Sequence, residues 1–147
     1  MAIRDTKIKP FIEDRDENVS IGIDLPFRKS DGPDGWFASS STTIEAVKNN
    51  IRYLLQTEQG ERYMQPNLGL GLRKYMFEQV NEDTTVQIQG DILTTIGNWL
   101  PFVEVRELDV SMEGSDTTGR NKLSISVVFN ITRDPSTLES VQVEIGD

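Results

Sequence analysis

The sequence predicts an α+β protein, in which an antiparallel sheet of about three to four strands packs against two amphipathic helices. Apolar residues recur every three or four positions over residues 42–59 and 83–99, which is the spacing of a helix with one buried face. In the last third of the chain they alternate with polar residues instead, as in half-buried strands. We expect one folded domain over residues 19–147, preceded by a flexible N-terminal arm over residues 1–18.

The N-terminal part of the chain predicts an arm, a strand and a loop. Residues 1–18 mix charges with a few apolar side chains and have no regular period, so we expect them to order only against a partner or the domain surface. Residues 19–25 alternate apolar and polar side chains, which predicts a half-buried strand that Pro26 ends. The next segment is rich in Gly, Pro, Asp and Ser and predicts a loop, anchored by Trp36 and Phe37.

The first helix has a clear start signal. Thr42 followed three residues later by Glu45 is typical of a capping box, in which each side chain satisfies a backbone N–H of the other residue. We expect Gly60 to close this helix as a left-handed residue just past its end. The side chains expected to face the core are Ile44, Val47, Ile51, Leu54 and Leu55.

A turn-rich passage separates this helix from a second one. Residues 61–65 are compatible with a short strand, and residues 72–78 with one or two helical turns. The second helix is expected from Asp83 to Trp99, because Pro101 cannot continue it. Its core-facing side chains are expected to be Val86, Leu93, Ile96 and Leu100, with Ile88, Ile92 and Trp99 widening that face.

The last third of the chain predicts a long hairpin and a third strand. In the first strand the alternation changes phase after Val105, which predicts a β-bulge near Arg106 and Glu107. The second strand has the most regular alternation in the chain. The three strands are expected over residues 103–112, 122–132 and 138–145.

The composition excludes several classes of function. The 147 residues contain neither Cys nor His, which removes disulfides, thiol nucleophiles, Ser-His-Asp triads and the usual zinc sites. The 15 Lys and Arg against 24 Asp and Glu give a net charge of −9, which repels phosphate backbones. No segment approaches the roughly 18 apolar residues of a membrane-spanning helix. We therefore expect no cofactor and no bound metal, and neither nucleic acid nor membrane as a partner.

One enzymatic class stays open as the alternative function, a lysozyme-like peptidoglycan hydrolase that uses two carboxylates. Such an enzyme needs carboxyl groups about 5–9.5 Å apart, with surroundings that keep one of them protonated. Acidic residues are abundant here, and none is marked out by an aromatic cleft pattern, so we expect no catalytic residue. The acids that satisfy only the requirement for residue type include Asp31, Asp34, Glu61, Glu78 and Asp91.

Four parts of the sequence carry a resemblance to a known family. They are IGIDLPF, DGWFASSS, LLQTEQGERYMQPNLGLGLRKYMFE and LPFVEVRELDV. Together with the second helix they resemble the GPW-type baseplate wedge family of contractile phage tails, the sheath initiators, over residues 19–132. GERYMQPNLG followed by an aromatic-rich helical turn is the most specific piece. Relatives of this family include the T-even phage wedge component and the corresponding baseplate part of type VI secretion machines.

The resemblance implies a structural adaptor, located in the virion tail baseplate and, during assembly, in the host cytoplasm. The family carries Glu-Pro-Arg where this chain has Glu104, Val105 and Arg106, so the two charged residues are implied to bind wedge proteins although Pro is absent. Glu61 and Arg62 are implied as further wedge contacts. The implied partners are baseplate wedge proteins and the tail sheath protein, with tail tube or hub proteins as further candidates.

The resemblance also implies an exposed sheet edge that templates the first ring of tail sheath. Long strands suit this task, because an edge strand offers unpaired backbone N–H and C=O groups. SISVVFNIT has no charge and no Pro, so it needs cover from a partner strand or, as a central strand, from its own neighbours. In either case one strand stays at the edge, and residues 138–145 are the first candidate. The residues expected at the sheath contact are Val141, Val143, Ile145, Leu123, Ile125 and Val127.

Overall fold

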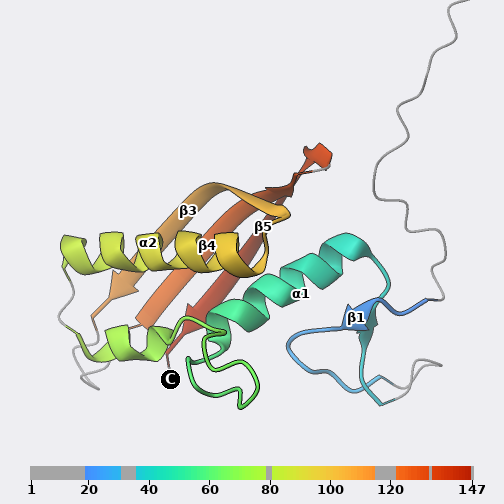
Figure 1. Cartoon of the computed structure of the whole chain (residues 1–147), viewed down its shortest axis with the longest axis horizontal. Helices are drawn as coiled ribbons and strands as arrows, with labels where there is room; N and C mark the ends of the chain where they lie inside the picture. The colour runs from blue at the N-terminus through green and yellow to red at the C-terminus, as the bar shows by residue number, and fades with distance from the viewer. Residues whose placement is uncertain (1–18, 31–35, 79–80, 115–121, 133, 147) are drawn as a thin grey trace, which may run out of the picture.

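The structure, a computed structural model, describes residues 19–30, 36–78, 81–114, 122–132 and 134–146 (Figure 1). The expected arm, residues 1–18, and the acids Asp31 and Asp34 lie outside these ranges. Within the ranges the chain forms two α-helices, one 3₁₀ helix and five strands.

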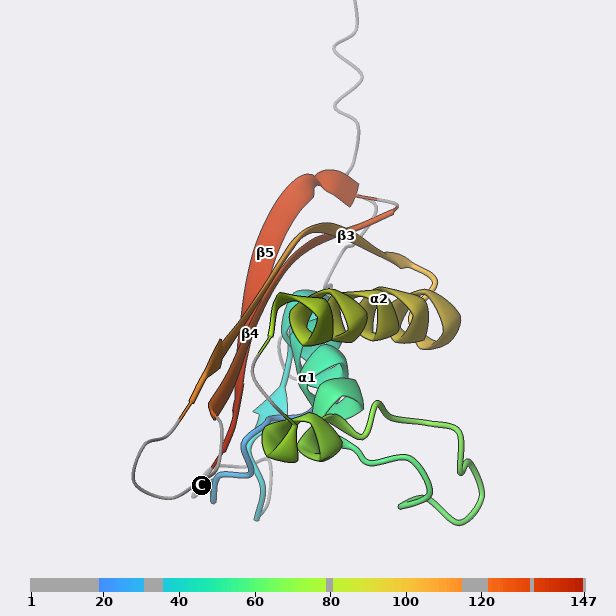
Figure 2. The ribbon, with the colours of Figure 1, turned by 90° about the vertical axis from the view of Figure 1, so that its left-hand side faces the viewer.

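Two layers make up the larger part of the described structure (Figure 2). One is an antiparallel sheet in the order β3-β4-β5, formed by Val103–Glu113, Lys122–Ile131 and Asp134–Ile145. The other contains helices α1 (Thr43–Gln56) and α2 (Glu82–Trp99), which lie on one face of the sheet and contact β5 and β3 respectively. The predicted α+β class is therefore confirmed, although β5 begins earlier than the expected residue 138.

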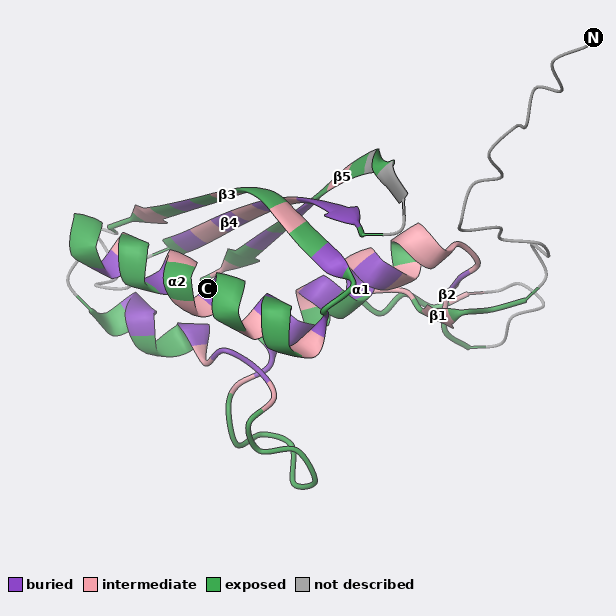
Figure 3. Ribbon diagram, turned by 45° about the horizontal axis from the view of Figure 1, so that its top comes forward, coloured by how far each residue is buried: buried purple, intermediate pink, exposed green. Residues whose placement is uncertain are grey.

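The hairpin of β3 and β4 contains the predicted bulge, because their register shifts between Val105 and Glu107. The extra residue resets the alternation, so apolar side chains on both sides of the bulge face the helices. Figure 3 shows buried residues gathered where the helices meet the sheet. This face of the hairpin carries Val103, Val105, Leu108, Val110 and Met112 from β3, and Leu123, Ile125, Val127, Phe129 and Ile131 from β4.

α2 buries a narrower face than the sequence predicts. Ile88, Ile92 and Ile96, spaced by four residues, are fully buried in the core. Val86 and Leu93 are exposed, so their prediction as core residues is wrong. The buried residues of this helix form one row at a spacing of four, and Val86 and Leu93 lie outside that row.

The 3₁₀ helix η1 (Leu72–Phe77) confirms the predicted helical turns before α2. Its Tyr75 is buried, and the hydroxyl donates a hydrogen bond to the Asp91 carboxylate on α2 at 2.7 Å. Burial, and then this contact with Asp91, raise the pKa of the Tyr75 hydroxyl well above its usual range. The hydroxyl therefore stays protonated and links η1 to α2.

α1 begins where predicted but ends earlier. The Thr42 hydroxyl accepts a hydrogen bond from the backbone N–H of Glu45 at 3.3 Å, which confirms the N-cap. At the other end the backbone N–H and hydroxyl of Thr57 both donate to the Tyr53 carbonyl, at 3.0 and 2.7 Å. Gly60 has a left-handed φ of 88° but belongs to the following turn, so its prediction as the helix-closing residue is wrong.

GERYMQPNLG forms part of a closed loop instead of the short strand considered for residues 61–65. The Gly60 N–H donates to the Pro66 carbonyl at 2.8 Å, and the Leu70 N–H donates to the Thr57 carbonyl at 3.1 Å. Gly69 has a φ of 105°, and a Cβ at this position would lie 2.3 Å from the Thr57 carbonyl oxygen. The closure of this loop, residues 57–71, therefore requires glycine at position 69.

The predicted N-terminal strand is much shorter than expected. β1 (Gly22–Ile23) pairs with β2 (Ser39–Ser40) in a separate two-stranded sheet beside the N-terminal end of α1. The small sheet contacts α1, and Ser40 on β2 is buried, but several apolar residues of this hairpin are exposed. They include Val19, Ile21 and Ile23. Trp36 and Phe37 are 78% and 57% exposed, so their prediction as anchors of the loop is wrong.

A polar network at Asn49 anchors the hairpin to α1. The buried Asn49 amide donates to the Ile23 carbonyl at 3.4 Å and to the Asp24 carboxylate at 3.3 Å. The Arg52 guanidinium donates to the Asn49 side-chain oxygen at 3.1 Å and to the Leu25 carbonyl at 3.2 Å. A hydrogen bond from Arg28, more than the one from Asn49, holds the pKa of Asp24 below its usual range.

Asn49→Ala is expected to lower the free energy of unfolding by about 1–3 kcal/mol, because it leaves buried polar partners unsatisfied. Amide exchange at Ile21 and Asp24, whose N–H groups donate to β2 and its neighbour, should rise more than exchange in β4. Urea unfolding and hydrogen exchange measure both effects. Asn50→Ala, at an exposed neighbouring position, is the control, and equal stability of the two variants would contradict the anchoring role.

Candidate functional site

The charged residues of the predicted wedge-binding motif lie together on β3. Arg106, at the bulge, has its Nη2 at 3.0 Å from a carboxylate oxygen of Glu104. The Arg106 Nε donates to the side-chain oxygen of Asn130 at 3.2 Å, and Asn130 lies opposite Glu104 on β4. Val105 packs against the core between the two charged residues. We call Glu104, Arg106 and Asn130 the β3 polar cluster.

The β3 polar cluster combines exposed charges with one buried amide. The side chains of Arg106 and Glu104 are 49% and 50% exposed, and such a pair contributes roughly 0–1 kcal/mol to folding. Asn130 is buried, and its Nδ2 has no hydrogen-bond partner in the described structure. A buried amide N–H without an acceptor costs about 1–3 kcal/mol. The cluster therefore combines a half-exposed guanidinium and carboxylate with a buried, unsatisfied amide.

Sequence reasoning missed Asn130. A single Asn in a strand is common and does not indicate a site. That Asn130 lies opposite Glu104 depends on the register of the hairpin. That register places the amide beneath the Arg106 guanidinium, where it orients the side chain.

The structure places the six predicted strand-pairing residues in two neighbouring strands with different roles. β4 is the central strand and pairs with β3 and β5 on its two sides. The backbone of Leu123, Ile125 and Val127 is therefore already paired, and these residues cannot offer an open edge. β5 is an edge strand, and no described strand pairs with its outer side. Its three predicted residues, opposite the three on β4, are Val141, Val143 and Ile145.

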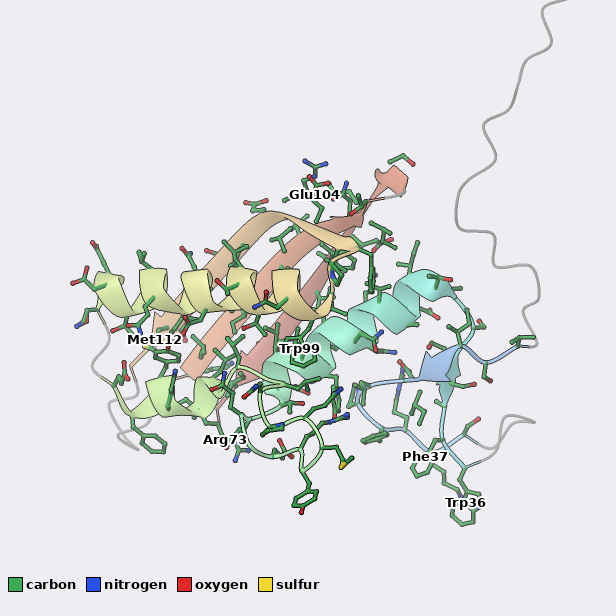
Figure 4. The ribbon with its side chains drawn as sticks, in the orientation of Figure 1. Trp36, Phe37, Arg73, Trp99, Glu104 and Met112 are labelled. Carbon is green, nitrogen blue, oxygen red and sulfur yellow. The ribbon has the colours of Figure 1, made fainter. Side chains whose placement is uncertain are left out.

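Glu61 and Arg62 lie apart from the β3 polar cluster. They belong to the loop 57–71, which projects from the helical layer away from the sheet, whereas Glu104 is on the opposite side of the molecule (Figure 4). A Glu61 carboxylate oxygen accepts the backbone N–H of Glu58 at 3.1 Å. Arg62 contacts the hydroxyl of Tyr53 and lies over its ring, 4.5 Å from the centroid. Both residues stabilise the loop, and the structure does not join them to Glu104 and Arg106 in one surface.

Three of the acids considered for hydrolysis, Glu61, Glu78 and Asp91, lie within the described residues. Glu61 and Glu78 are exposed on separate segments, and Asp91 accepts the Tyr75 hydrogen bond. Two other carboxylates, Glu58 and Glu144, line a groove at the C-terminal end of β5. Each of these two has a cation as its partner, whereas a hydrolase needs one carboxyl held protonated by its surroundings.

Two features are absent from the ranges that the structure describes. No group of three or more acidic side chains there is arranged to hold a metal ion. No described helix is long and apolar enough to cross a membrane. The arrangement that the described residues do provide is a polar cluster beside an open-edged sheet.

Structures of similar fold include a protein from Geobacter sulfurreducens and chains of two baseplates. A crystal structure of the Geobacter protein, which is named "putative tail lysozyme", superposes with a TM-score of 0.59 at 23% identity, covering 74% of this chain and 94% of the other. The baseplate of the anti-feeding prophage contains a chain with a TM-score of 0.59 at 23% identity, covering 75% and 83%. A chain in the baseplate complex of the type VI secretion system gives 0.53 at 18%, covering 69% and 91%.

Sequence comparison places the chain in a family. The baseplate wedge protein gp25 of Enterobacteria phage T4 is 22% identical over 108 residues, which cover 74% of this chain and 79% of the phage protein. The family model described as baseplate wedge protein gp25 matches residues 41–136, from the start of α1 into β5. The resemblance found in the sequence is thereby confirmed, and the chain belongs to the baseplate wedge protein gp25 family.

Proposed function

We propose that this chain is a structural part of a contractile-tail baseplate, where it binds wedge proteins and templates the tail sheath by strand pairing. The observation that carries the proposal is the open outer edge of β5 in a member of the gp25 family. An extended segment of a sheath subunit adds there as a further strand. Each sheath ring can then offer the same main-chain hydrogen bonds to the next.

Both edge strands of the sheet contain a regular segment. β3 pairs with β4 in unbroken register from Glu107↔Val128 to Glu113↔Lys122, and β5 does so from Phe129↔Glu139 to Leu123↔Ile145. A regular strand presents evenly alternating donors and acceptors, so β5 is suited to a partner strand. We assign the sheath to β5 because the charged motif proposed for the wedge contact lies on β3.

The β3 polar cluster is the proposed contact with a wedge protein. Its guanidinium and carboxylate are positioned on one side of the strand, where they can each bind a charged or polar group of the partner. Wedge binding would then use side chains on β3, and sheath pairing the backbone of β5.

Tails assembled without this protein are expected to carry tubes and baseplates without a regular sheath. The reason is that sheath subunits lose the strand edge on which their first ring forms. Electron microscopy of such particles, with and without the protein supplied in trans, measures the fraction that carry sheath. A normal sheath in particles that lack the protein would contradict the proposal.

The protein is expected to have no peptidoglycan hydrolase activity, although one protein of similar fold is named a tail lysozyme. Glu58 and Glu144 at the groove are each paired with a cation, and Asp91 accepts a hydrogen bond from Tyr75, so none of these three is marked out as a catalytic acid. A zymogram with purified protein and hen lysozyme as the positive control checks this. Clearing of the cell-wall substrate that a single Asp or Glu to amide change abolishes would overturn it.

A further inference from the structure

The end of the loop 57–71 carries two large apolar side chains that face solvent. The Gln65 N–H donates to the Arg62 carbonyl at 3.2 Å, which closes a four-residue turn there. Tyr63 and Met64 are the two central residues of this turn, and they are 97% and 87% exposed. We call these two residues the loop tip.

The loop tip has no role in the folded core. Among the large apolar residues that the structure describes, Tyr63 is the most exposed and Met64 the second. The other two tyrosines of the chain use their hydroxyls internally, since Tyr75 donates to Asp91 and Tyr53 contacts Arg62. Burial in the core therefore does not explain the tyrosine and methionine at the tip, whereas burial against a partner does.

The loop is braced behind its tip. Leu70 is buried in the core and Leu68 packs against it, which fixes one end of the loop. The Glu61 carboxylate accepts a backbone N–H within the loop at 3.1 Å, and the Arg62 guanidinium lies over the ring of Tyr53. Backbone hydrogen bonds cross the loop as well. The turn therefore has its shape before a partner binds, and little ordering of the loop opposes binding.

The charged side chains near the tip already have contacts within the chain. Glu61 and Arg62 have the contacts just given, and the Glu58 carboxylate lies 3.4 Å from the Arg73 guanidinium. What the loop offers to a partner is therefore an aromatic ring and a thioether. Tyrosine supplies a large, rigid contact area, and methionine adapts to an irregular surface. The chemistry that matches this tip is an apolar pocket.

The position of the loop favours a wedge protein over the sheath as its partner. The loop projects from the helical layer away from the sheet, whereas a sheath strand added to β5 would extend the sheet in its own plane (Figure 2). The loop also lies within residues 41–136, which match the baseplate wedge family.

We propose that the loop 57–71 is a second wedge contact, which inserts Tyr63 and Met64 into an apolar pocket of a baseplate wedge protein. This inference rests on the proposed function. The loop tip makes the contact, and Glu61 and Arg62 are positioning residues that hold the turn behind it.

Tyr63→Ala is expected to weaken binding to a wedge protein about 30-fold, because a large aromatic anchor is lost from the contact. The ring is fully exposed in the free chain, so urea unfolding should be unchanged. Isothermal titration with purified wedge proteins measures the affinity. Gln65→Ala, at an exposed polar position of the same turn, is the matched control and should stay within about threefold of the unaltered chain. Equal affinities of the two variants would overturn the inference.

Arg106→Ala separates this inference from the proposed function. If Arg106→Ala weakens wedge binding and Tyr63→Ala does not, the role of the loop tip is overturned and the proposed function stands. If the unaltered chain binds no wedge protein, the proposed function fails, and the inference fails with it.

Photo-crosslinking in assembled baseplates identifies the partner of the loop tip directly. p-Benzoylphenylalanine in place of Tyr63 is expected to label a wedge protein, at a site formed by apolar residues. Labelling of the sheath, of the tail tube, of a second copy of this chain or of nothing would overturn the inference.

Discussion

Either Gln142 or Val143 has its backbone N–H on the open side of β5. Proline at that position is expected to abolish sheath assembly while leaving the domain folded. Successive N–H groups of an edge strand alternate between the neighbouring strand and the open side. Proline at the residue whose N–H points outward removes one donor from the open edge of β5, and its ring obstructs the approach of a partner strand. Assembly of sheath on baseplates should fall at least about tenfold, as counted by electron microscopy.

Proline at the other position, whose N–H points toward β4, should destabilise the domain. There it removes a hydrogen bond to β4 and should lower the free energy of unfolding by about 3 kcal/mol or more. Gln142→Ala and Val143→Ala remove the same side chains but keep both N–H groups, so they separate backbone from side-chain effects. Normal sheath on baseplates carrying either proline variant, at normal stability, would exclude β5 as the pairing edge.

Local chemistry explains why much of the fold could be predicted. The N-cap at Thr42 depends on residues within one helical turn, and the phase change after Val105 reports the bulge directly. The order of strands in the hairpin follows from a short connection. Each of these features is encoded within a few consecutive residues.

The mistaken predictions concern burial that depends on distant segments. Val86 and Leu93 have helical spacing, but burial also needs another layer opposite them. The fully buried row of α2 is Ile88, Ile92 and Ile96, and Val86 and Leu93 lie outside it. Residues 19–25 alternate as a strand does, yet the only described strand beside them is two residues long. Trp36 was expected to anchor a loop that has little packing of its own, whereas its side chain is 78% exposed.

The site could be predicted in part for similar reasons. A period of two places Glu104 and Arg106 on one side of a strand, and the structure joins them directly. The position of Asn130 beside Glu104 depends on the pairing of β3 with β4. The groove at the end of β5 is formed by three segments that meet only in the folded chain. Single-sequence patterns do not contain these relations.

Arg106→Ala is expected to weaken binding to a baseplate wedge protein by about 2–5 kcal/mol, which is roughly 30-fold to several thousand-fold. In the free chain, loss of the half-exposed Arg106 to Glu104 pair should lower the free energy of unfolding by about 0–1 kcal/mol. Loss of the hydrogen bond to the buried Asn130 oxygen should lower it by about a further 1–3 kcal/mol. The larger effect arises at an interface, where the remaining partner groups lose both water and the guanidinium. Isothermal titration with purified wedge proteins measures the first quantity and urea unfolding the second.

Arg28→Ala is the matched control, because Arg28 is an exposed arginine paired with Asp24 on the β1–β2 hairpin. Glu104→Gln, alone and combined with Arg106→Ala, completes a double-mutant cycle that isolates the coupling between the two charged residues. Arg62→Ala tests whether the loop 57–71 is a second wedge contact, and its effect should add to that of Arg106→Ala because the two residues share no partner. A change in wedge affinity of less than about threefold for Arg106→Ala would leave the β3 polar cluster as a surface ion pair with no role in binding.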